Sequence, residues 1–375
     1  MSLFSDLMSK LNLDSLVPKQ APDQVVGVDI GTSSIKLVEI KKKGGKAVLE
    51  TYSTLALGPY AGQDVGAITN LTQDVLAKAI MDALKEGSIS TKNAVISVPS
   101  SASLVFVLEL PSAISEKELP AIIPNEARKY IPVPVSEVTL DYWVIPKQQT
   151  SFYEENPDDS KLPAKSEVLT VAIHNDTIGK YRDLTTKTEL DTDTYEIEIF
   201  SSIRSTFTHE LSAVLLIDFG ASKTKLAIVE YGIVRSFHII NRGSFDITSN
   251  MSKSLGIPFK VAEDLKREIG LNGTGNNKQA SDVAKLAVDY IVSETQSTIS
   301  NFERKYEKPI SKIILTGAGS LLPGFHAHAQ EVFKTEVVMG NPFDKVEVPA
   351  FIANVLKETG PEFAVALGLA LRKLG

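Results

Sequence analysis

The chain has 375 residues, of which 43% are hydrophobic and 23% charged, which is the composition of a globular protein long enough for two or more folded units. Its formal charge of −7 argues against a nucleic-acid-binding protein, because such proteins normally carry a basic face. The absence of cysteine excludes disulfides and cysteine-ligated zinc, and no stretch approaches the roughly 18 apolar residues of a membrane span, so we expect a soluble, cytoplasmic protein.

The N-terminal segment, residues 1–24, contains leucines at helical spacing. Leu3, Leu7 and Leu11 predict one apolar side of a short amphipathic helix. Two interpretations stay open: the helix rests on a membrane or a partner, or it packs on its own chain. The segment lacks the basic start and long apolar run of a signal peptide.

One pattern occurs twice in the chain. Each copy has an apolar, β-branched run, a short turn of glycine and small residues, and a second apolar run: VVGVDIGTSSIKLVEI at 25–40 and VLLIDFGASKTKLAIV at 214–229. When the copies are aligned, identical residues coincide at several positions, among them Asp29 and Asp218, Gly31 and Gly220, Lys36 and Lys225, and Leu37 and Leu226. The pattern is typical of a β-hairpin, and two hairpins predict two lobes that face one ligand.

Strands and helices alternate after the first hairpin until their order changes. The periodicity predicts a helix over 74–86 and a strand over 94–98. The next elements are predicted as strand, helix, strand and strand, at 104–111, 116–130, 138–146 and 167–174, with a polar surface loop over 148–165. This order predicts a small inserted α+β domain.

The remaining elements follow in the order of an α/β protein. Before the second hairpin we predict a helix over 181–190, a strand over 195–200 and a short helix over 201–207. After it, the predicted helices cover 246–255, 258–269, 281–306 and 363–374, with a polar loop at 270–278 and a buried strand at 312–315. The predicted fold class is therefore α/β.

The two hairpin turns are the first candidates for a binding site. Residues 31–34 and 220–223 offer clustered backbone N–H donors and hydroxyls, which suit a phosphate. Asp29 and Asp218, at the strand ends, would face the same place with the carboxylate oxygens that magnesium prefers. A single Asp-x-Gly turn is common in structural turns, so it is the repetition that favours a ligand.

A third glycine-rich turn, TGAGSLLPG at 316–324, follows a buried strand and precedes a helix. Glycine lets a flat ring approach the backbone, and a helix N-terminus favours negative charge. Alone, this segment would equally suit an ordinary loop between a strand and a helix. Its position after the two hairpins favours a binding role.

These motifs together resemble a known superfamily. DIGTSSIK, DFGASKTK and TGAGSLLPG are similar to the phosphate 1, phosphate 2 and adenosine motifs of the actin-like ATPases, which include actin, Hsp70-type chaperones, sugar kinases and FtsA. More narrowly, the chain resembles the PilM family, the FtsA-like proteins of type IV pilus assembly, in the segments 109–145, 243–268, 340–346 and 362–375. The resemblance covers nearly the whole chain from Val25.

The resemblance implies a two-lobed actin-like ATPase fold, made of duplicated RNase H-like domains, with an inserted FtsA-type 1C (SHS2-like) α+β subdomain. The first lobe (1A) would comprise residues 25–100, 191–212 and 355–375, and the inserted subdomain residues 101–190. The second lobe would comprise residues 213–245 and 310–354 (2A), with residues 246–309 as its own subdomain (2B).

The resemblance also implies ATP or ADP with Mg²⁺ as cofactors. The residues that would clamp the phosphates come from both hairpins: Gly31, Thr32, Ser33, Ser34, Gly220, Ala221, Ser222 and Thr224. Asp29 and Asp218 would hold the metal through waters. Lys36 has the spacing of a β-phosphate ligand, with a solvated strand lysine as the alternative.

By the same resemblance, the nucleoside would lie on the second lobe. Glu263 and Lys266, one turn apart on a helix, match positions that hydrogen-bond the ribose and adenine, with an exposed ion pair as the alternative. Gly317, Ala318 and Gly319 would pass under the adenine. The family often has three glycines here, so the methyl group of Ala318 would crowd the ring.

Glu198 is the candidate catalytic residue. It lies where related proteins place a side chain that orients the attacking water. The alternative is that Glu196 and Glu198 form the solvent face of an alternating strand. Because no strong base is evident, we expect at most a slow ATPase.

The resemblance finally implies a partner. A scaffold of this family would bind the cytoplasmic N-terminal peptide of a PilN-like inner-membrane protein, in a groove between the first lobe and the inserted subdomain and near RKYIPVP at 128–134. The protein would lie at the cytoplasmic face of the inner membrane, would use nucleotide as a clamp, and would be a candidate for self-association. Two alternatives stay open: a small-molecule kinase and an FtsA-like cell-division protein.

Overall fold

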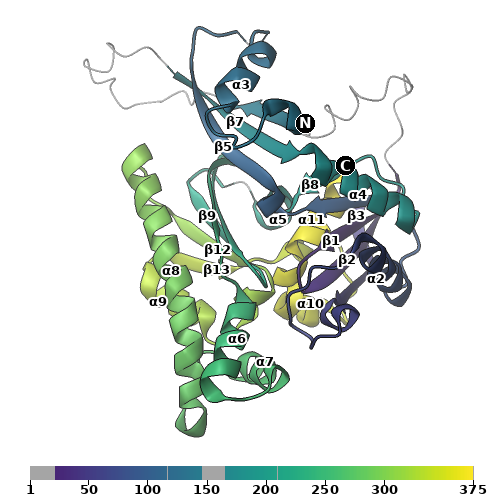
Figure 1. Ribbon diagram of the computed structural model, residues 1–375, viewed down its shortest axis with the longest axis vertical. Coiled ribbons are helices and arrows are strands. Elements are labelled where there is room, and N and C mark those ends of the chain that lie inside the picture. Colours follow the sequence, from purple (N-terminus) through teal and green to yellow (C-terminus); the bar gives the residue numbers. More distant parts are fainter. Residues whose placement is uncertain (1–21, 116, 146–164, 209, 375) are drawn as a thin grey trace.

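The computed structural model describes residues 22–115, 117–145, 165–208 and 210–374. Three β-sheets and the helices around them make up this part of the chain, and Figure 1 shows two lobes with a smaller unit above them. The helix predicted around Leu3, Leu7 and Leu11 and the loop predicted over 148–165 fall outside the described residues, apart from residue 165.

The first lobe is built on a five-stranded sheet that contains the first copy of the repeat. Its strand order is β3-β2-β1-β4-β8; β3, β2 and β1 are antiparallel, and β4 and β8 continue the sheet in parallel. The strands are β1 (Gln24–Ile30), β2 (Ser34–Lys43), β3 (Lys46–Ala56), β4 (Ala94–Val98) and β8 (Tyr195–Ile197). The helices of this lobe are α2 (Gln73–Glu86), α5 (Glu198–Thr206), α10 (Ala353–Thr359) and α11 (Ala364–Leu374).

Alternate residues of β1 serve the two faces of this sheet. Val26 and Val28 are fully buried in the cluster that includes α2, and Val25 is fully buried in the cluster that includes α11. Helix α11 approaches β1 so closely that a Cβ on Gly27 would lie 1.8 Å from the carbonyl oxygen of Ala366. Only glycine permits this approach, and it sets the position of α11 under the sheet.

The second lobe repeats the first sheet with the second copy of the motif. Its order is β11-β10-β9-β12-β13, with the same sequence of two antiparallel and two parallel pairings. The strands are β9 (Val214–Phe219), β10 (Thr224–Glu230), β11 (Ile233–Ile240), β12 (Lys312–Thr316) and β13 (Glu336–Met339). The helices are α6 (Ser244–Leu255), α7 (Phe259–Glu268), α8 (Lys278–Tyr306) and α9 (Phe325–Phe333). The sequence repeat is thus a repeat of topology.

The smaller unit is inserted between β4 and β8 of the first lobe. It has an antiparallel sheet of order β5-β7-β6 and two helices, in the strand, helix, strand, strand order that the sequence predicts. The elements are β5 (Ser103–Pro111), α3 (Leu119–Ala127), β6 (Val138–Val144), β7 (Lys165–His174) and α4 (Asn175–Thr188). Helix α3 is shorter than the helix predicted over 116–130, and Pro124 lies inside it.

One predicted strand is wrong in part. The segment 195–200 continues as a strand only to Ile197, and helix α5 begins at Glu198. Glu196 and Glu198 alternate with apolar residues, which is the pattern of a strand with one face in solvent, but both glutamate side chains are buried. The sequence pattern also predicted no strand for β3 and β11, because these edge strands are half exposed and lack a long buried run.

Within the described residues, no helix has both the length and the apolar character that a membrane crossing requires.

Candidate functional site

A cavity of about 570 Å³ lies between the two lobes. Both hairpin turns, the turn after β12 and helix α7 contribute to its wall. The sequence-predicted site residues that line it are Asp29, Gly31, Thr32, Ser33, Ser34, Lys36, Glu198, Asp218, Gly220, Ala221, Ser222, Glu263, Lys266, Gly317, Ala318 and Gly319. The fold therefore brings these separated segments to one place, and the volume is in the usual range for a small-molecule site.

Thr224 is the predicted site residue that does not line this cavity. Its side chain is fully buried, and its hydroxyl donates a hydrogen bond to the carbonyl oxygen of Arg242, 2.9 Å away. Thr224 pairs with Phe219 at the start of β10, where it joins β9 to the following strand. The expectation that Thr224 contacts phosphate is corrected to a structural role beneath the turn.

The two hairpin turns have the same geometry. The N–H of Gly31 donates to the carbonyl oxygen of Ser34, and the N–H of Gly220 donates to that of Lys223, both at 3.0 Å. A Cβ at either glycine would lie within 3.0 Å of the accepting oxygen, so each turn requires glycine.

The backbone N–H donors next to these glycines are the next feature of the two turns. Within the described part of the chain, no hydrogen-bond acceptor is found for the backbone N–H groups of Thr32, Ser33, Ala221 and Ser222. Unpaired N–H groups in a turn form an anion-binding concavity. Each lobe therefore presents one such concavity to the cavity between them.

The third glycine-rich turn is shaped by its contact with β9. Gly317 has φ +80°, and a Cβ there would lie 2.5 Å from a carboxylate oxygen of Asp218. A Cβ on Gly319 would lie 2.6 Å from the ring of Phe219. The protein itself thus requires glycine at both positions, whatever approaches from the cavity, and Ala318 stands between them on the cavity wall.

Asp29 is a buried carboxylic acid with little hydrogen-bonding support. Its side chain accepts one hydrogen bond, 3.2 Å long, from the hydroxyl of Ser97, which in turn accepts the N–H of Ile30. Burial raises the pKa of Asp29 to about 6, although the nearby ammonium of Lys36 opposes the shift. A cation placed at this carboxylate would relieve the cost of its burial.

Lys36 lies directly across the hairpin from Asp29, as its register partner. Its ammonium donates to the hydroxyl of Ser34 at 2.9 Å, and the side chain is buried on the cavity wall. The alternative of a solvated strand lysine is therefore wrong. The position suits a positive charge directed at a ligand held in the first turn.

Asp218 carries a cation of its own. The ammonium of Lys225 lies 3.0 Å from Asp218 and 2.9 Å from Glu198, so it bridges the two carboxylates. Burial disfavours the charged form of Lys225, but the two carboxylates outweigh it and raise its pKa above the usual range. Lys225 was not predicted as a site residue, although the sequence repeat aligns it with Lys36, which was the signal available.

Glu198 is buried at the N-terminus of α5, so the alternative of a solvent-facing strand residue is wrong. Besides Lys225, it accepts a hydrogen bond of 2.8 Å from the backbone N–H of Ser100. Its carboxylate is thus held between the first lobe and the second.

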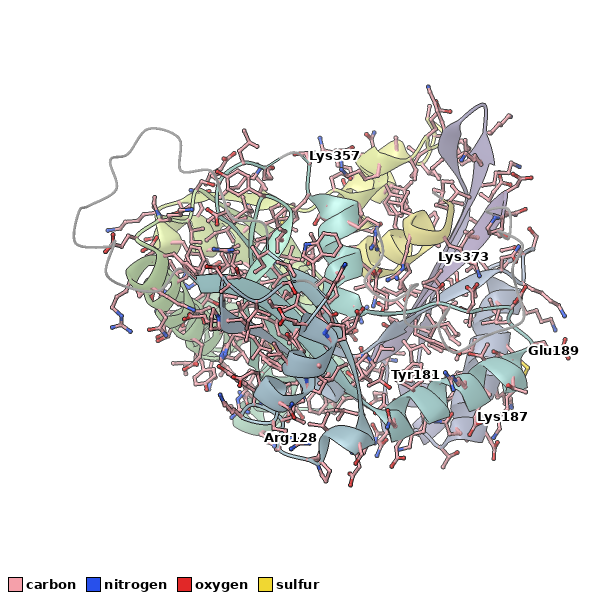
Figure 2. All side chains as sticks on the ribbon, turned by 90° about the horizontal axis from the view of Figure 1, so that it is seen from above. Arg128, Tyr181, Lys187, Glu189, Lys357 and Lys373 are labelled. Carbon is pink, nitrogen blue, oxygen red and sulfur yellow. The ribbon has the colours of Figure 1, made fainter. Side chains whose placement is uncertain are left out.

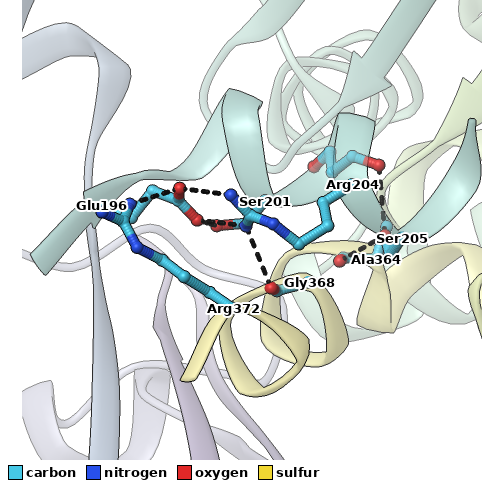
Figure 3. Close-up of polar contacts among 8 residues, drawn as sticks. Glu196, Ser201, Arg204, Ser205, Ala364, Gly368 and Arg372 are labelled. Atoms are coloured by element: carbon cyan, nitrogen blue, oxygen red, sulfur yellow. Dashed lines mark hydrogen bonds and ion pairs between the residues drawn. The ribbon is translucent and has the colours of Figure 1, made fainter. Parts of the chain in front are cut away.

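Glu196 is also buried, but it does not line this cavity. Arg204 binds its two oxygens at 2.5 and 2.7 Å, and Arg372 binds one of them at 2.5 Å, as Figure 3 shows. Burial opposes ionisation of Glu196, but the two guanidinium groups lower its pKa below the usual range. This ion-pair network fixes α5, which begins with Glu198, against α11.

Glu263 and Lys266 form a buried ion pair of 2.7 Å on α7, which corrects the alternative of an exposed pair. Glu263 also accepts from the hydroxyl of Thr248 at 2.6 Å and pairs with Arg267 at 2.8 Å. Burial alone would raise the pKa of Glu263, but Lys266 and its other partners lower it. Burial lowers the pKa of Lys266. A charged, oriented carboxylate at the cavity wall suits hydroxyl or amino donors.

The residues present fit a magnesium nucleotide. Asp29 and Asp218 reach the cavity from the two lobes, and no group of three or more metal-ligating side chains occurs among the described residues. Two carboxylates with waters and phosphate oxygens are a usual set of ligands for Mg²⁺, which binds few protein groups directly.

Other residues of the cavity wall, which the sequence motifs did not predict, include Val65, Gly66, Ser244, Arg267 and Glu362.

A comparison with known families decides the identity of this fold. The family model of the type IV pilus assembly protein PilM matches residues 27–374. The chain belongs to the PilM family. As a member of the PilM family it is an actin-like, FtsA-like protein of type IV pilus assembly, as the motifs predicted.

Relatives of the PilM-family chain support the same fold. The cell-division protein FtsA of Pseudomonas aeruginosa is 24% identical over 376 residues, which cover 91% of this chain and 88% of FtsA. A chain of a solved PilM–PilN type IV pilus biogenesis complex is 21% identical, with a TM-score of 0.78 over 95% of this chain and 100% of that one. MreB5 of Spiroplasma citri, solved with ADP, is 11% identical, with a TM-score of 0.50 over 93% of this chain and 95% of MreB5. These likenesses confirm the two-lobed actin-like fold.

Proposed function

We propose that this PilM-family protein binds Mg²⁺ and ATP or ADP between its lobes and acts as a nucleotide-clamped scaffold. The observation that carries the proposal is the convergence of two glycine turns with free N–H groups on one cavity, one from each lobe. The solved MreB5 of the same fold holds ADP, which agrees with this assignment. The units of the scaffold are proposed to divide as the family resemblance implies, with the inserted subdomain at 101–190.

In this proposal each group on the cavity wall has one task. The N–H groups of both turns and the ammonium of Lys36 bind phosphate oxygens. Asp29 and Asp218 hold Mg²⁺ through waters, which supplies the positive charge that the buried Asp29 lacks. Glu263 and Lys266 bind the ribose and adenine, with residues 317–319 beside the ring.

Hydrolysis is proposed to be slow or absent. Glu198 is the candidate that would orient a water, but Lys225 binds its carboxylate at 2.9 Å and the N–H of Ser100 occupies another lone pair. A carboxylate whose charge is neutralised in this way is a poor general base. The nucleotide then acts as a ligand that sets the arrangement of the two lobes. That arrangement determines which surface the scaffold presents to its partner.

The partner is proposed to be the cytoplasmic N-terminal peptide of a PilN-like inner-membrane protein, because a family relative is solved as a PilM–PilN complex. We place the peptide between the first lobe and the inserted subdomain, which would bring the protein to the inner membrane through its partner. Helix α4 joins these two units: Tyr181 packs edge-on against Tyr195 of β8, and Lys187 pairs with Asp74 of α2. Figure 2 shows Tyr181 and Lys187 along α4, with Arg128 on the inserted unit nearby in the view.

The nucleotide proposal is tested by calorimetric titration of ATP with and without Mg²⁺. We expect magnesium-dependent binding to the wild type and its loss in Asp218→Ala. Asp264→Ala is the matched control, because Asp264 is an exposed aspartate on α7, beside the site but outside the cavity. Equal affinity of Asp218→Ala and wild type would refute the site.

The partner proposal is tested by binding a synthetic PilN-type peptide. Tyr130 belongs to the 128–134 segment, is half exposed and stacks on Phe106 with ring centroids 4.8 Å apart. We expect Tyr130→Ala to weaken binding, whereas Tyr290→Ala, an equally exposed tyrosine on α8, leaves it unchanged. Equal loss in both variants, or in neither, would contradict this placement of the groove.

A further inference from the structure

A compact loop of the first lobe rests on the first phosphate turn. Residues 57–69 form most of the connection between β3 and α2, and both ends of this segment bond to that turn. The N–H of Leu57 donates to the carbonyl oxygen of Ser33 at 2.9 Å, and that of Thr69 donates to the carbonyl oxygen of Thr32 at 2.8 Å. The hydroxyl of Thr69 donates to the same oxygen of Thr32 at 3.1 Å. The loop, called the strap below, is therefore fixed at its base to the backbone carbonyls of the turn.

The strap is held together by its own contacts. The N–H of Gln63 donates to Gly58 at 2.9 Å, and a Cβ on Gly58 would lie 2.0 Å from the carbonyl oxygen of Asp64. Leu57, its first residue, is buried, and the hydroxyl of Tyr60 donates to the carboxylate of Asp82 on α2 at 2.7 Å. A loop whose ends are close together and whose own residues pack against one another is a compact unit of the surface.

The tip of the strap reaches the other lobe. Gly66 has φ +92°, and a Cβ there would lie 2.7 Å from the carboxyl carbon of Glu263 on α7 and 2.9 Å from each of its oxygens. Val65 and Gly66 both line the cavity. A glycine without a side chain therefore lies directly against the carboxylate that the proposed function assigns to the nucleoside.

We infer that the strap, residues 57–69, closes the nucleoside end of the cavity by seating Gly66 on Glu263, and that bound nucleotide favours this closed arrangement. The inference rests on the proposed nucleotide site. The base of the strap bonds to the carbonyl oxygens of Thr32 and Ser33, whose N–H groups the proposed function assigns to the phosphates, and its tip meets Glu263. A ligand held at both places stabilises the one arrangement of lobes in which base and tip are both engaged.

The chain offers a matched pair of glycines for the test. Gly62 and Gly66 lie in the same strap with positive φ, +66° and +92°, so alanine strains the backbone at either position. A Cβ on Gly66 collides with Glu263, whereas one on Gly62 meets nothing within 4 Å. Comparing the two alanine variants therefore distinguishes the effect of the collision with Glu263 from the effect of backbone strain.

The experiment measures the affinity and dissociation rate of a fluorescent ATP analogue with Mg²⁺. We expect Gly66→Ala to weaken binding about tenfold and to speed release, because the tip no longer seats, with Gly62→Ala close to wild type. Equal affinities in wild type, Gly62→Ala and Gly66→Ala would overturn the strap and leave the nucleotide site standing. Absence of binding to the wild type would overturn the proposed function instead.

A distance measurement tests the same inference without depending on affinity. The chain has no cysteine, so spin labels on Val65→Cys and Asp264→Cys report only the distance between the strap tip and α7. We expect ATP and Mg²⁺ to shift the wild-type strap to one short, narrow distance, and Gly66→Ala to keep a broad one. An identical distribution with and without nucleotide in the native strap would refute nucleotide-dependent closure, even if Gly66→Ala fails to fold.

Discussion

The ammonium of Lys225 lies 2.9 Å from the carboxylate of Glu198, and this ion pair joins strand β10 of the second lobe to helix α5 of the first. Both side chains are largely buried, and the same ammonium also binds Asp218. The contact has two effects: it links the lobes across the cavity, and it neutralises the carboxylate that we propose as the candidate to orient a water.

Replacing Lys225 with methionine should destabilise the nucleotide-free protein by about 3–5 kcal/mol, because it leaves buried carboxylates without their cation. Urea unfolding of the variant and the wild type measures the change. Lys260→Met is the control, since Lys260 is exposed on α7, and its effect should stay within about 0.5 kcal/mol.

The double variant Lys225→Met with Glu198→Gln isolates this pair. We expect the double variant to be more stable than the sum of the single changes predicts, since the unpaired Glu198 carboxylate is gone. Strictly additive effects would mean that the 2.9 Å contact contributes nothing to the coupling between the lobes.

The repeat in the sequence was enough to predict much of the fold. Two apolar hairpins with Asp and Gly at matching positions predicted two similar lobes, because buried strands next to tight turns have a strong local pattern. The edge strands β3 and β11 were not predicted, since their half-exposed residues follow no continuous apolar run. Their pairing is set by the neighbouring strands β2 and β10.

The site was predictable where residues are close in sequence and less so where the fold joins distant ones. Asp29 and Gly31 belong to one turn, so their shared position follows from the motif. The bond between Lys225 and Glu198, and the contact of Gly66 with Glu263, each join elements of different lobes. No local pattern in the chain encodes such contacts, because they depend on how the lobes pack.

Stability should depend on pH through Asp29. The pKa of Asp29 is raised from 3.8 to about 6 in the folded protein. Between these two pH values, the folded state therefore keeps a proton on Asp29 that the unfolded state has lost. Stability from this group therefore falls as the pH rises from about 4 to above 6, by roughly 3 kcal/mol in total. Asp29→Asn cannot ionise, so its stability relative to wild type should increase over the same pH range.

Denaturant titrations of wild type and Asp29→Asn at pH 4.5, 5.5, 6.5 and 7.5 measure this difference. Adding Mg²⁺ with ATP should reduce it, because a cation at the carboxylate favours the charged form. A stability difference that stays constant across the four pH values would show that burial does not shift the ionisation of Asp29.

The network around Glu196 should be sensitive to loss of Arg372. Arg372 is a buried guanidinium that binds Glu196 at 2.5 Å from α11, and its replacement by methionine should cost about 3 kcal/mol. The neighbouring Lys373→Met is the control: Lys373 pairs with the exposed Asp193 at 3.1 Å, and its loss should cost less than about 1 kcal/mol. Equal losses of stability in the two variants would show that the buried network around Glu196 contributes no more than the Lys373–Asp193 pair.

The stabilisation that this network provides should depend on pH in one direction. The guanidinium groups hold the pKa of Glu196 below its usual range, despite its burial. The stabilisation is therefore present above the normal glutamate pKa and is lost as the pH falls through the lowered one. Arg372→Met and wild type should accordingly converge in stability toward acidic pH, which chemical denaturation at pH 3 to 6 would reveal.

The same substitution at two helical glycines should have opposite effects. A Cβ on Gly368 of α11 would lie 1.9 Å from the carbonyl oxygen of Ser201 on α5, so Gly368→Ala must separate the two helices and should cost at least about 3 kcal/mol. Gly179 of α4 is exposed, and a Cβ there would meet nothing within 4 Å, so Gly179→Ala should stabilise the protein by about 0.5–1 kcal/mol through helix propensity. Thermal unfolding of both variants measures the two signs. Because Glu198 of α5 and Ala364 of α11 both line the cavity, separating the two helices changes its wall, so we also expect Gly368→Ala to weaken ATP binding and Gly179→Ala to leave it unchanged. A stable Gly368→Ala variant would contradict the close packing of α11 on α5.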